Sequence, residues 1–253
     1  VYKSAVFKDG VASAVELKAI GDYANQSTGR GTVGPKYAGA VAGLGKLMWA
    51  PKLVLSRFQM MAGKSMWGGE RGTRIAIAKE YGRILTGMAT VYAVAGFLNS
   101  EITIEEDPRS SDWRKLKLGN RRIDIMGGLV QNTVFISRIL TGETKTSKGR
   151  IKAIRGDVGF GSMNTWDVMA NFMRSKLTPA LGSAVNVLTG ENMVGEKVTI
   201  YDMPQELFVP LVMEDIYDSM VEDGVPNGLA LAILAEFGVG VQIYDANKRR
   251  YKE

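Results

Sequence analysis

Apolar residues recur every three or four positions along most of the chain, which is the spacing of helices that bury one face. Residues 35–61 show this spacing and predict a helix that breaks before Pro51, because proline lacks a backbone donor and crowds the preceding turn. A glycine-rich turn follows, and residues 73–99 then predict one long helix. Further helices are predicted at residues 127–141, 165–176, 179–189, 205–222 and 227–236.

Residues 114–125 follow a different pattern. Apolar and charged residues alternate there on both sides of Gly119-Asn120, which predicts a β-hairpin. The polar residues 141–150 predict a flexible loop. The predicted fold class is therefore mainly α, an irregular helical bundle with one small β-hairpin.

Two missing residue types restrict the chemistry. The chain has no Cys and no His, which excludes disulfides, thiolate nucleophiles, the usual structural zinc sites and a Ser-His-Asp triad. The run Glu105-Glu106-Asp107 before Pro108 indicates a solvated turn more than a metal clamp. No catalytic residue, cofactor or metal ligand can be named from spacing, and any catalysis would rest on Asp, Glu, Lys, Tyr or Ser.

The net charge of +6 is unevenly distributed. Residues 109–155 hold twelve bases and three acids, whereas residues 201–247 hold nine acids and no base. Either the basic block binds DNA or another anionic surface, or the two blocks face each other within the chain or between copies. The candidate residues for an anionic partner are Arg114, Lys115, Lys117, Arg121, Arg122, Lys148, Arg150 and Lys152.

Gly29, Gly31 and Gly34 match the G-x-G-x-x-G pattern of dinucleotide-binding loops. Such a loop needs an apolar strand directly before it, but residues 22–27 are polar. The pattern therefore favours a tight turn that leads into a helix at Pro35.

Residues 84–98 form an apolar run without any charge. As a helix the run would be about 22 Å long, shorter than the ~30 Å hydrocarbon core of a membrane. It predicts either a buried core helix or a helix that enters a membrane conditionally. The candidate packing or membrane residues are Ile84, Leu85, Val91, Val94, Phe97 and Leu98.

Several short motifs occur in an order that resembles one family. They lie at residues 27–31 (STGRG), 49–57 (WAPKLVLSR), 107–113 (DPRSSDW), 122–128 (RIDIMGG), 175–179 (SKLTP), 188–190 (LTG) and 238–242 (GVGVQ). This order resembles a large polyvalent protein-associated domain of tailed phages and prophages. The residues that carry the motifs include Thr28, Gly29, Arg30, Gly31, Asp107, Pro108, Asp124, Gly127 and Gly128. We interpret Arg30 as a structural residue whose guanidinium ties down its turn.

The length of 253 residues fits one domain or two small ones. The family resemblance extends over about residues 25–244, and it implies a single, mostly helical domain there, followed by a charged tail over residues 245–253. It also implies that residues 1–24 are a linker or a helix from the preceding part of a larger chain, which agrees with the opening Val1.

The resemblance implies a non-enzymatic structural or interaction domain of a phage internal virion protein, also called an ejection protein. Such a domain would be packaged in the capsid interior or tail path and delivered with the genome to the host envelope or cytoplasm. The implied partners are other virion proteins, such as portal or inner-core proteins, together with phage DNA and, transiently, the host membrane. Multiple copies are expected. The alternative is a C-terminal accessory piece of a larger virion-packaged enzyme, a polymerase or a peptidase.

Overall fold

The computed structural model describes residues 13–146, 148–156, 162–192, 197–202 and 239–243, with isolated positions between 213 and 233. Seven α-helices and six short strands lie in this part of the chain, so the mainly α fold class is confirmed. The chain divides into two compact units, Val1–Ala93 and Val94–Glu253. The boundary falls inside a helix, α5 (Arg71–Leu98).

The first described element of the first unit is α2 (Ala14–Ser27), which starts at a capping box. Ser13 Oγ accepts a hydrogen bond from the Glu16 N–H at 3.2 Å, and the Glu16 carboxylate accepts one from the Ser13 N–H at 3.0 Å. This arrangement satisfies backbone donors that the first helical turn leaves free. Because α2 is continuous through residue 27, it crosses the boundary that the sequence predicted after residue 24.

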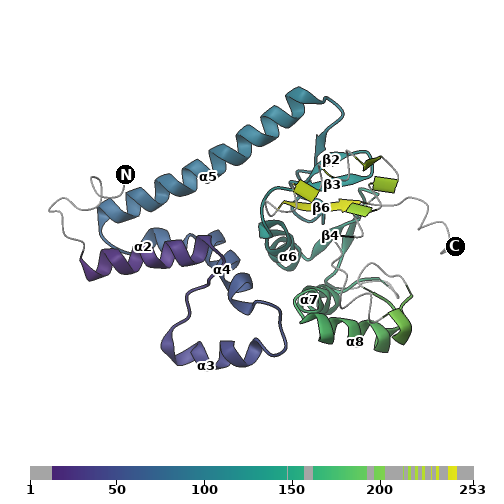
Figure 1. Cartoon of the computed structure of the whole chain (residues 1–253), viewed down its shortest axis with the longest axis horizontal. Helices are drawn as coiled ribbons and strands as arrows, with labels where there is room; N and C mark the ends of the chain where they lie inside the picture. Colours follow the sequence, from purple (N-terminus) through teal and green to yellow (C-terminus); the bar gives the residue numbers. More distant parts are fainter. Residues whose placement is uncertain are drawn as a thin grey trace. The chain divides into compact units, whose positions relative to one another are not determined.

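Residues 35–61 form two helices and not one, and the break before Pro51 is the one that the sequence predicted. α3 (Pro35–Leu44) and α4 (Pro51–Met61) each have proline in their first turn, where its missing N–H costs nothing. α4 packs against α2, while α3 lies on a loop that extends beyond α4 (Figure 1). A short 3-10 helix, η1 (Lys64–Trp67), leads into α5.

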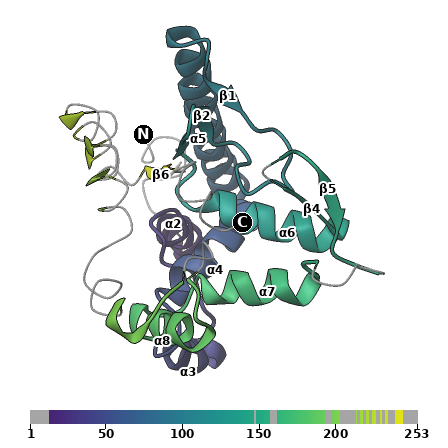
Figure 2. The ribbon, with the colours of Figure 1, turned by 90° about the vertical axis from the view of Figure 1, so that its right-hand side faces the viewer.

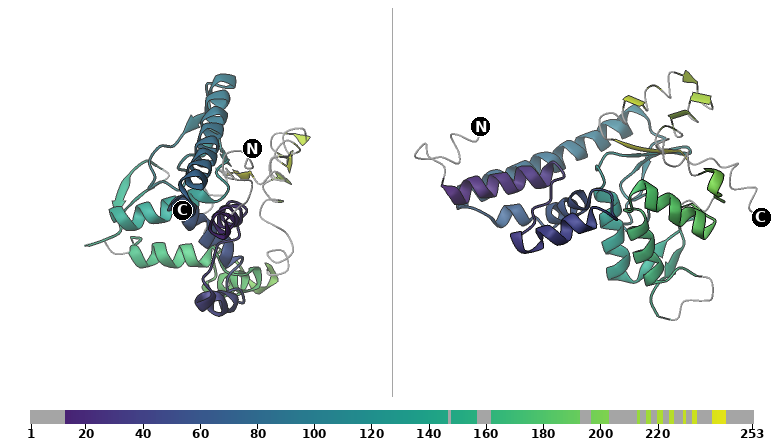
Figure 3. Two further views of the ribbon diagram at one scale, coloured as in Figure 1. Left: turned by 90° about the vertical axis from the view of Figure 1, so that its left-hand side faces the viewer. Right: turned by 60° about the horizontal axis from the view of Figure 1, so that its bottom comes forward.

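α5 confirms the predicted long helix and is one unbroken rod in every view (Figure 3). Its N-terminal end is anchored by Thr73 and Ile77, both almost fully buried. These are the buried residues of the helix, so the anchored part ends well before residue 84.

The second unit contains a four-stranded antiparallel sheet in the order β1-β2-β3-β6. β2 (Leu116–Leu118) and β3 (Arg121–Asp124) form the predicted hairpin, with Leu116 opposite Ile123. β1 (Thr103–Ile104) and β6 (Gly240–Ile243) add to its two edges. The β structure is therefore larger than the single hairpin that the sequence predicted.

A second hairpin occupies part of the flexible loop predicted at residues 141–150, so that prediction was wrong for the strand residues 143–145. β4 (Glu143–Lys145) pairs with β5 (Ile151–Ala153), with Thr144 opposite Lys152. Thr146 closes the turn: its N–H and its hydroxyl both donate to the Arg150 carbonyl, at 2.9 and 3.1 Å. The strands escaped sequence analysis because each is three residues long, too short to show an alternating pattern.

Three helices complete the second unit: α6 (Leu129–Thr141), α7 (Thr165–Arg174) and α8 (Pro179–Thr189), followed by the 3-10 turn η2 (Ile200–Asp202). α6 and α7 run side by side (Figure 2), and the rings of Phe135 and Phe172 stack between them at 4.1 Å. Most residues of the predicted helices 205–222 and 227–236, and the tail 245–253, lie outside the described residues.

Candidate functional site

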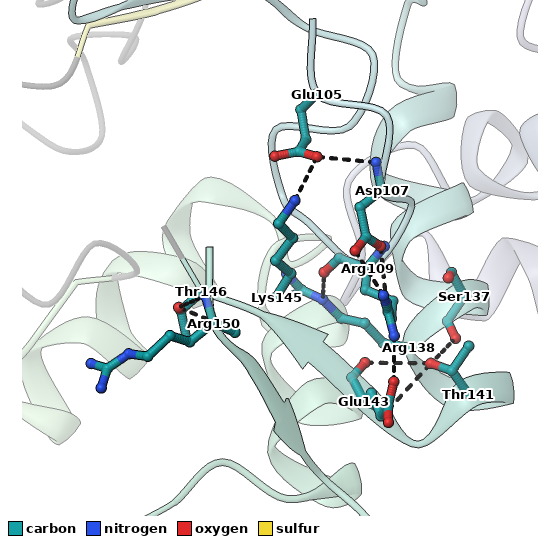
Figure 4. Close-up of polar contacts among 10 residues, drawn as sticks. All are labelled: Glu105, Asp107, Arg109, Ser137, Arg138, Thr141, Glu143, Lys145, Thr146 and Arg150. Atoms are coloured by element: carbon teal, nitrogen blue, oxygen red, sulfur yellow. Dashed lines mark hydrogen bonds and ion pairs between the residues drawn. The ribbon is translucent and has the colours of Figure 1, made fainter. Parts of the chain in front are cut away.

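The loop between β1 and β2 and the start of the second hairpin share a network of charged side chains (Figure 4). At its centre, the Arg109 guanidinium donates two parallel hydrogen bonds to the Asp107 carboxylate, from Nε to Oδ1 at 2.9 Å and from Nη2 to Oδ2 at 2.8 Å. Arg109 also donates to the carboxylate of Glu143 on β4. A guanidinium that binds one carboxylate in this forked way fixes both geometry and charge.

The backbone of Arg109 is held as firmly as its side chain. Its carbonyl accepts hydrogen bonds from Arg138 Nε on α6 at 2.8 Å and from the Lys145 N–H at 3.3 Å. Its own N–H donates to Asp107 Oδ1 at 3.0 Å. The network therefore ties the loop to both α6 and β4.

Glu105 links the same loop to two lysines. Lys145 Nζ lies 2.8 Å from Glu105 Oε1, and Lys117 Nζ lies 3.6 Å from Oε2. The Asp107 N–H also donates to Glu105 Oε1. The prediction of a merely solvated turn at residues 105–107 was wrong for these two acids, because each has a cationic partner.

Asp112 is surrounded by three cations of the first hairpin. Its carboxylate lies 3.1 Å from Arg122 Nε, 3.5 Å from Lys115 Nζ and 3.7 Å from Lys117 Nζ. Lys115 is only 7% exposed, and its ammonium donates to Gln242 on β6 at 2.7 Å. Lys115 is thus a buried structural cation, which corrects its place among candidate surface contacts.

The electrostatics of the network follow from these contacts. The hydrogen bond with Arg109 lowers the pKa of Asp107 to about 2, against a partial opposing effect of burial. Burial acts to raise the pKa of Glu105, but Lys145, the Asp107 N–H and Lys117 together lower it. Burial lowers the pKa of Lys115 despite the nearby Asp112 and Asp124. At neutral pH the two acids of the loop are therefore charged and paired.

The described ion pairs of the basic block use acids that lie close to it in the sequence. Those of Arg109, Lys115, Lys117, Arg122 and Lys145 use Glu105, Asp107, Asp112 and Glu143. Of the nine acids in residues 201–247, Asp202 alone lies among the described residues. The predicted pairing of the acidic block with the basic block therefore falls outside the part of the chain that the structure describes.

Three candidate cations stand outside the network. Lys148, Arg150 and Lys152 are exposed on the turn and outer strand of the second hairpin, and the Arg150 guanidinium points away from the cluster (Figure 4). Arg114 and Arg121 are half-buried and engaged. The described surface available to an anionic partner in this region therefore centres on Lys148, Arg150 and Lys152.

The motif residues form two turns. Gly29, with φ of 86°, ends α2, and the Gly31 N–H donates to the Lys52 carbonyl at 2.9 Å. The backbone N–H groups of residues 28–32 are all bonded to protein oxygens, which supports a structural turn over a phosphate-binding loop. Our interpretation that the Arg30 guanidinium ties down the turn was wrong. The Arg30 side chain is exposed and makes no hydrogen bond to another described residue. Its backbone N–H instead donates to the Asn25 carbonyl and so stabilises the turn.

The other motif turns punctuate the second unit. Asp107 and Pro108 form the bend that presents Arg109. Asp124 Oδ1 accepts the Met126 N–H at 2.8 Å, and Gly127 and Gly128, both with positive φ, lead into α6. Burial raises the pKa of Asp124. These motif residues therefore have structural roles in the described chain.

The apolar run of α5 is exposed and not buried. All six candidate residues are accessible, from Ile84 at 37% to Phe97 at 89%. The core-helix interpretation of residues 84–98 was therefore wrong within the described chain. Among the described helices, none combines the length and apolar character needed to cross a bilayer.

Sequence reasoning missed Arg109, Arg138, Glu143 and Lys145 as members of one network, since spacing does not show which charges meet. Among the described residues, no group of three or more acids could hold a metal ion. No protein-family model, no curated protein and no solved structure matches the chain. The resemblance to a polyvalent protein-associated domain accordingly stays a prediction drawn from short motifs.

Proposed function

We propose that this chain is a non-enzymatic structural and interaction domain of a phage internal virion protein, packaged in the capsid and delivered with the genome. The observation that carries the proposal is the exposed apolar half of α5, residues 84–98. Residues 84–98 carry no charge, and exposing apolar side chains such as Phe97 and Leu98 to water costs free energy. Large exposed apolar patches mark interaction sites.

The charged network supports an interaction domain more than an enzyme. Asp107, Arg109 and Glu143 are committed to one another and to the backbone, so their charges hold loops in place. The exposed cations Lys148, Arg150 and Lys152 offer a second surface, suited to DNA phosphates. The virion context itself rests on the resemblance of the ordered motifs.

The proposal places neighbouring virion proteins, such as portal or inner-core proteins, against residues 84–98, with multiple copies in each particle. The test is photo-crosslinking inside assembled particles. A photoreactive phenylalanine analogue at position 97 should give adducts with another virion protein or with a second copy of this chain. The same analogue at Leu188, which is 85% exposed on α8, is the matched control.

Adducts at position 97 and few at position 188 would support the proposal. Equal labelling at both positions, or water-quenched product alone at position 97, would contradict the assignment of α5 as the contact surface.

A further inference from the structure

We propose that residues 34–50, which comprise α3 and the segment after it, dock on the surface of an anionic lipid bilayer. We call these residues the α3 loop. The inference rests on the proposed function, because a domain that is delivered into a host cell meets the host membrane. The proposed lipid contact is the α3 loop and not α5.

The α3 helix is apolar on two faces. One face, formed by Ala38, Val41 and Ala42, lines a cavity of about 460 Å³ together with Ala50 and Pro51 next to α4. The next face carries Tyr37, Ala40 and Leu44, which are exposed to solvent. No residue of α3 is buried. A helix with apolar side chains on most of its surface is stabilised when those side chains leave water for an apolar environment.

Aromatic residues with polar tips lie near the two ends of the α3 loop. Tyr37 is 60% exposed in the first turn of α3, and Trp49 is 64% exposed just before α4. Leu47, which lies between Tyr37 and Trp49 in the sequence, is 54% exposed. Tyrosine and tryptophan favour the boundary between lipid tails and water, where the ring is apolar and the tip stays hydrated.

The charge around the α3 loop has one sign. Residues 23–69 contain no Asp or Glu. They contain six bases: Arg30, Lys36, Lys46, Lys52, Arg57 and Lys64. Lys36, Lys46 and Lys52 flank the apolar side chains, and Lys36 Nζ lies 5.9 Å from the centre of the Tyr37 ring. Lysines beside an exposed apolar face complement the phosphates of acidic lipids, while their methylene stems reach along the apolar surface.

The composition favours lipid over a protein partner. A protein interface gains most of its energy from large anchors that fill pockets, whereas the middle of α3 offers Gly39, Ala40 and Gly43. A bilayer surface accepts such a helix without matching its shape. Since no described helix can cross a membrane, the contact would lie in the interface plane.

The test measures binding of the full chain to vesicles of equal parts phosphatidylcholine and phosphatidylglycerol, and to vesicles of phosphatidylcholine alone. We expect binding to the acidic vesicles only. The double variant Tyr37→Ala/Trp49→Ala should weaken it at least about tenfold, because two interfacial rings are lost. Lys36→Gln/Lys46→Gln/Lys52→Gln should weaken it about fivefold for each lysine removed.

Matched controls change equivalent exposed groups elsewhere. Trp166, which is 76% exposed on α7, is replaced in Trp166→Ala, and exposed charges near the start of α5 are removed in Arg71→Gln/Lys79→Gln. Both controls should bind acidic vesicles as the parent does. Circular dichroism of every variant confirms that the helices persist, so a loss of binding is not a loss of fold.

A second readout follows Trp49 directly in the variant Trp67→Phe/Trp113→Phe/Trp166→Phe. Its fluorescence should be quenched by acrylamide in solution, and should shift to the blue with acidic vesicles. Protection of Trp49 without vesicles would mean that another part of the chain or a second copy covers the loop, which overturns the inference. So would acidic-vesicle binding that survives the aromatic variant. Either result leaves the virion proposal standing, because crosslinking at position 97 tests that separately.

Discussion

Gln59 on α4 binds both backbone groups of Thr32, with Nε2 2.7 Å from the Thr32 carbonyl and Oε1 2.9 Å from the Thr32 N–H. The side-chain amide of Gln59 thus satisfies the backbone donor and acceptor of Thr32, as a neighbouring strand would, although the two residues are 27 positions apart. It is 7% exposed, so water cannot replace it easily. This pairing holds the backbone directly after the TGRG motif of residues 28–31.

Gln59→Ala should therefore lower the free energy of unfolding by about 1–3 kcal/mol, because two partly buried backbone groups lose their partner. Urea unfolding followed by circular dichroism measures the change. Asn171→Ala removes an exposed amide side chain of α7 and should change stability by no more than about 0.5 kcal/mol. Equal effects of the two changes would contradict this role of Gln59.

Gly31 is required by close packing of two backbones. A Cβ at this position would lie 2.7 Å from the Lys52 carbonyl oxygen and 2.9 Å from the Ser56 nitrogen. Gly31→Ala should cost about 1–3 kcal/mol, since backbone atoms must move apart. In the matched control Gly39→Ala the added Cβ meets no atom within 4 Å, and the change should stabilise the chain by up to about 1 kcal/mol. Thermal unfolding compares the two, and a shift in the same direction would refute the packing argument.

The ion pair of Asp107 and Arg109 should make stability depend on acid pH. The pKa of Asp107 is about 2 in the folded chain and 3.8 ordinarily, so the unfolded chain takes up the proton first. The stabilisation is complete above about pH 4 and is lost as the pH falls toward 2. Asp107→Asn should lack this part of the pH dependence while being less stable at neutral pH.

Urea midpoints between pH 2 and pH 6 measure that dependence. Glu106→Gln, which changes the exposed neighbour of Asp107, should keep the slope of the parent chain. If the urea midpoints of the parent chain and of Asp107→Asn changed equally with pH, the Asp107–Arg109 ion pair would contribute nothing to the pH dependence of stability.

The exposed hairpin cations should carry binding to DNA. Lys148→Gln/Arg150→Gln/Lys152→Gln should reduce the slope of log affinity against log salt by about three, nearly one for each DNA phosphate that a cation no longer neutralises. Fluorescence anisotropy with a labelled duplex measures the slope. Lys36→Gln/Lys46→Gln/Lys52→Gln makes the same change of charge at the α3 loop and should leave the slope unchanged. The reverse pattern would move the DNA surface to the first unit.

The helices could be predicted from sequence because the information is local. Apolar spacing located α5 and α6 to within two residues at each end, and Pro51 marked the break before α4. The hairpin of β2 and β3 followed from strict alternation about Gly119-Asn120. These signals lie within one element and need no knowledge of its neighbours.

The charged network could not be predicted in this way. Lys115 precedes an alternating strand and resembles a surface lysine, but β6 joins the sheet from far along the chain and brings Gln242 to it, 127 residues away. Arg109 meets Glu143 across 34 residues. Which charges pair depends on tertiary contacts, so a basic block read from sequence overstated the free positive surface.

The central claim is that this chain is virion cargo, and mass spectrometry of purified particles of the source phage tests it most directly. The tryptic peptide of residues 84–109, ILTGMATVYAVAGFLNSEITIEEDPR, covers the exposed half of α5 and the Asp107–Arg109 turn. We predict that this peptide is present at multiple copies per particle. Its absence from particles, with the protein present in infected cells, would contradict the claim and favour an accessory piece of an intracellular enzyme.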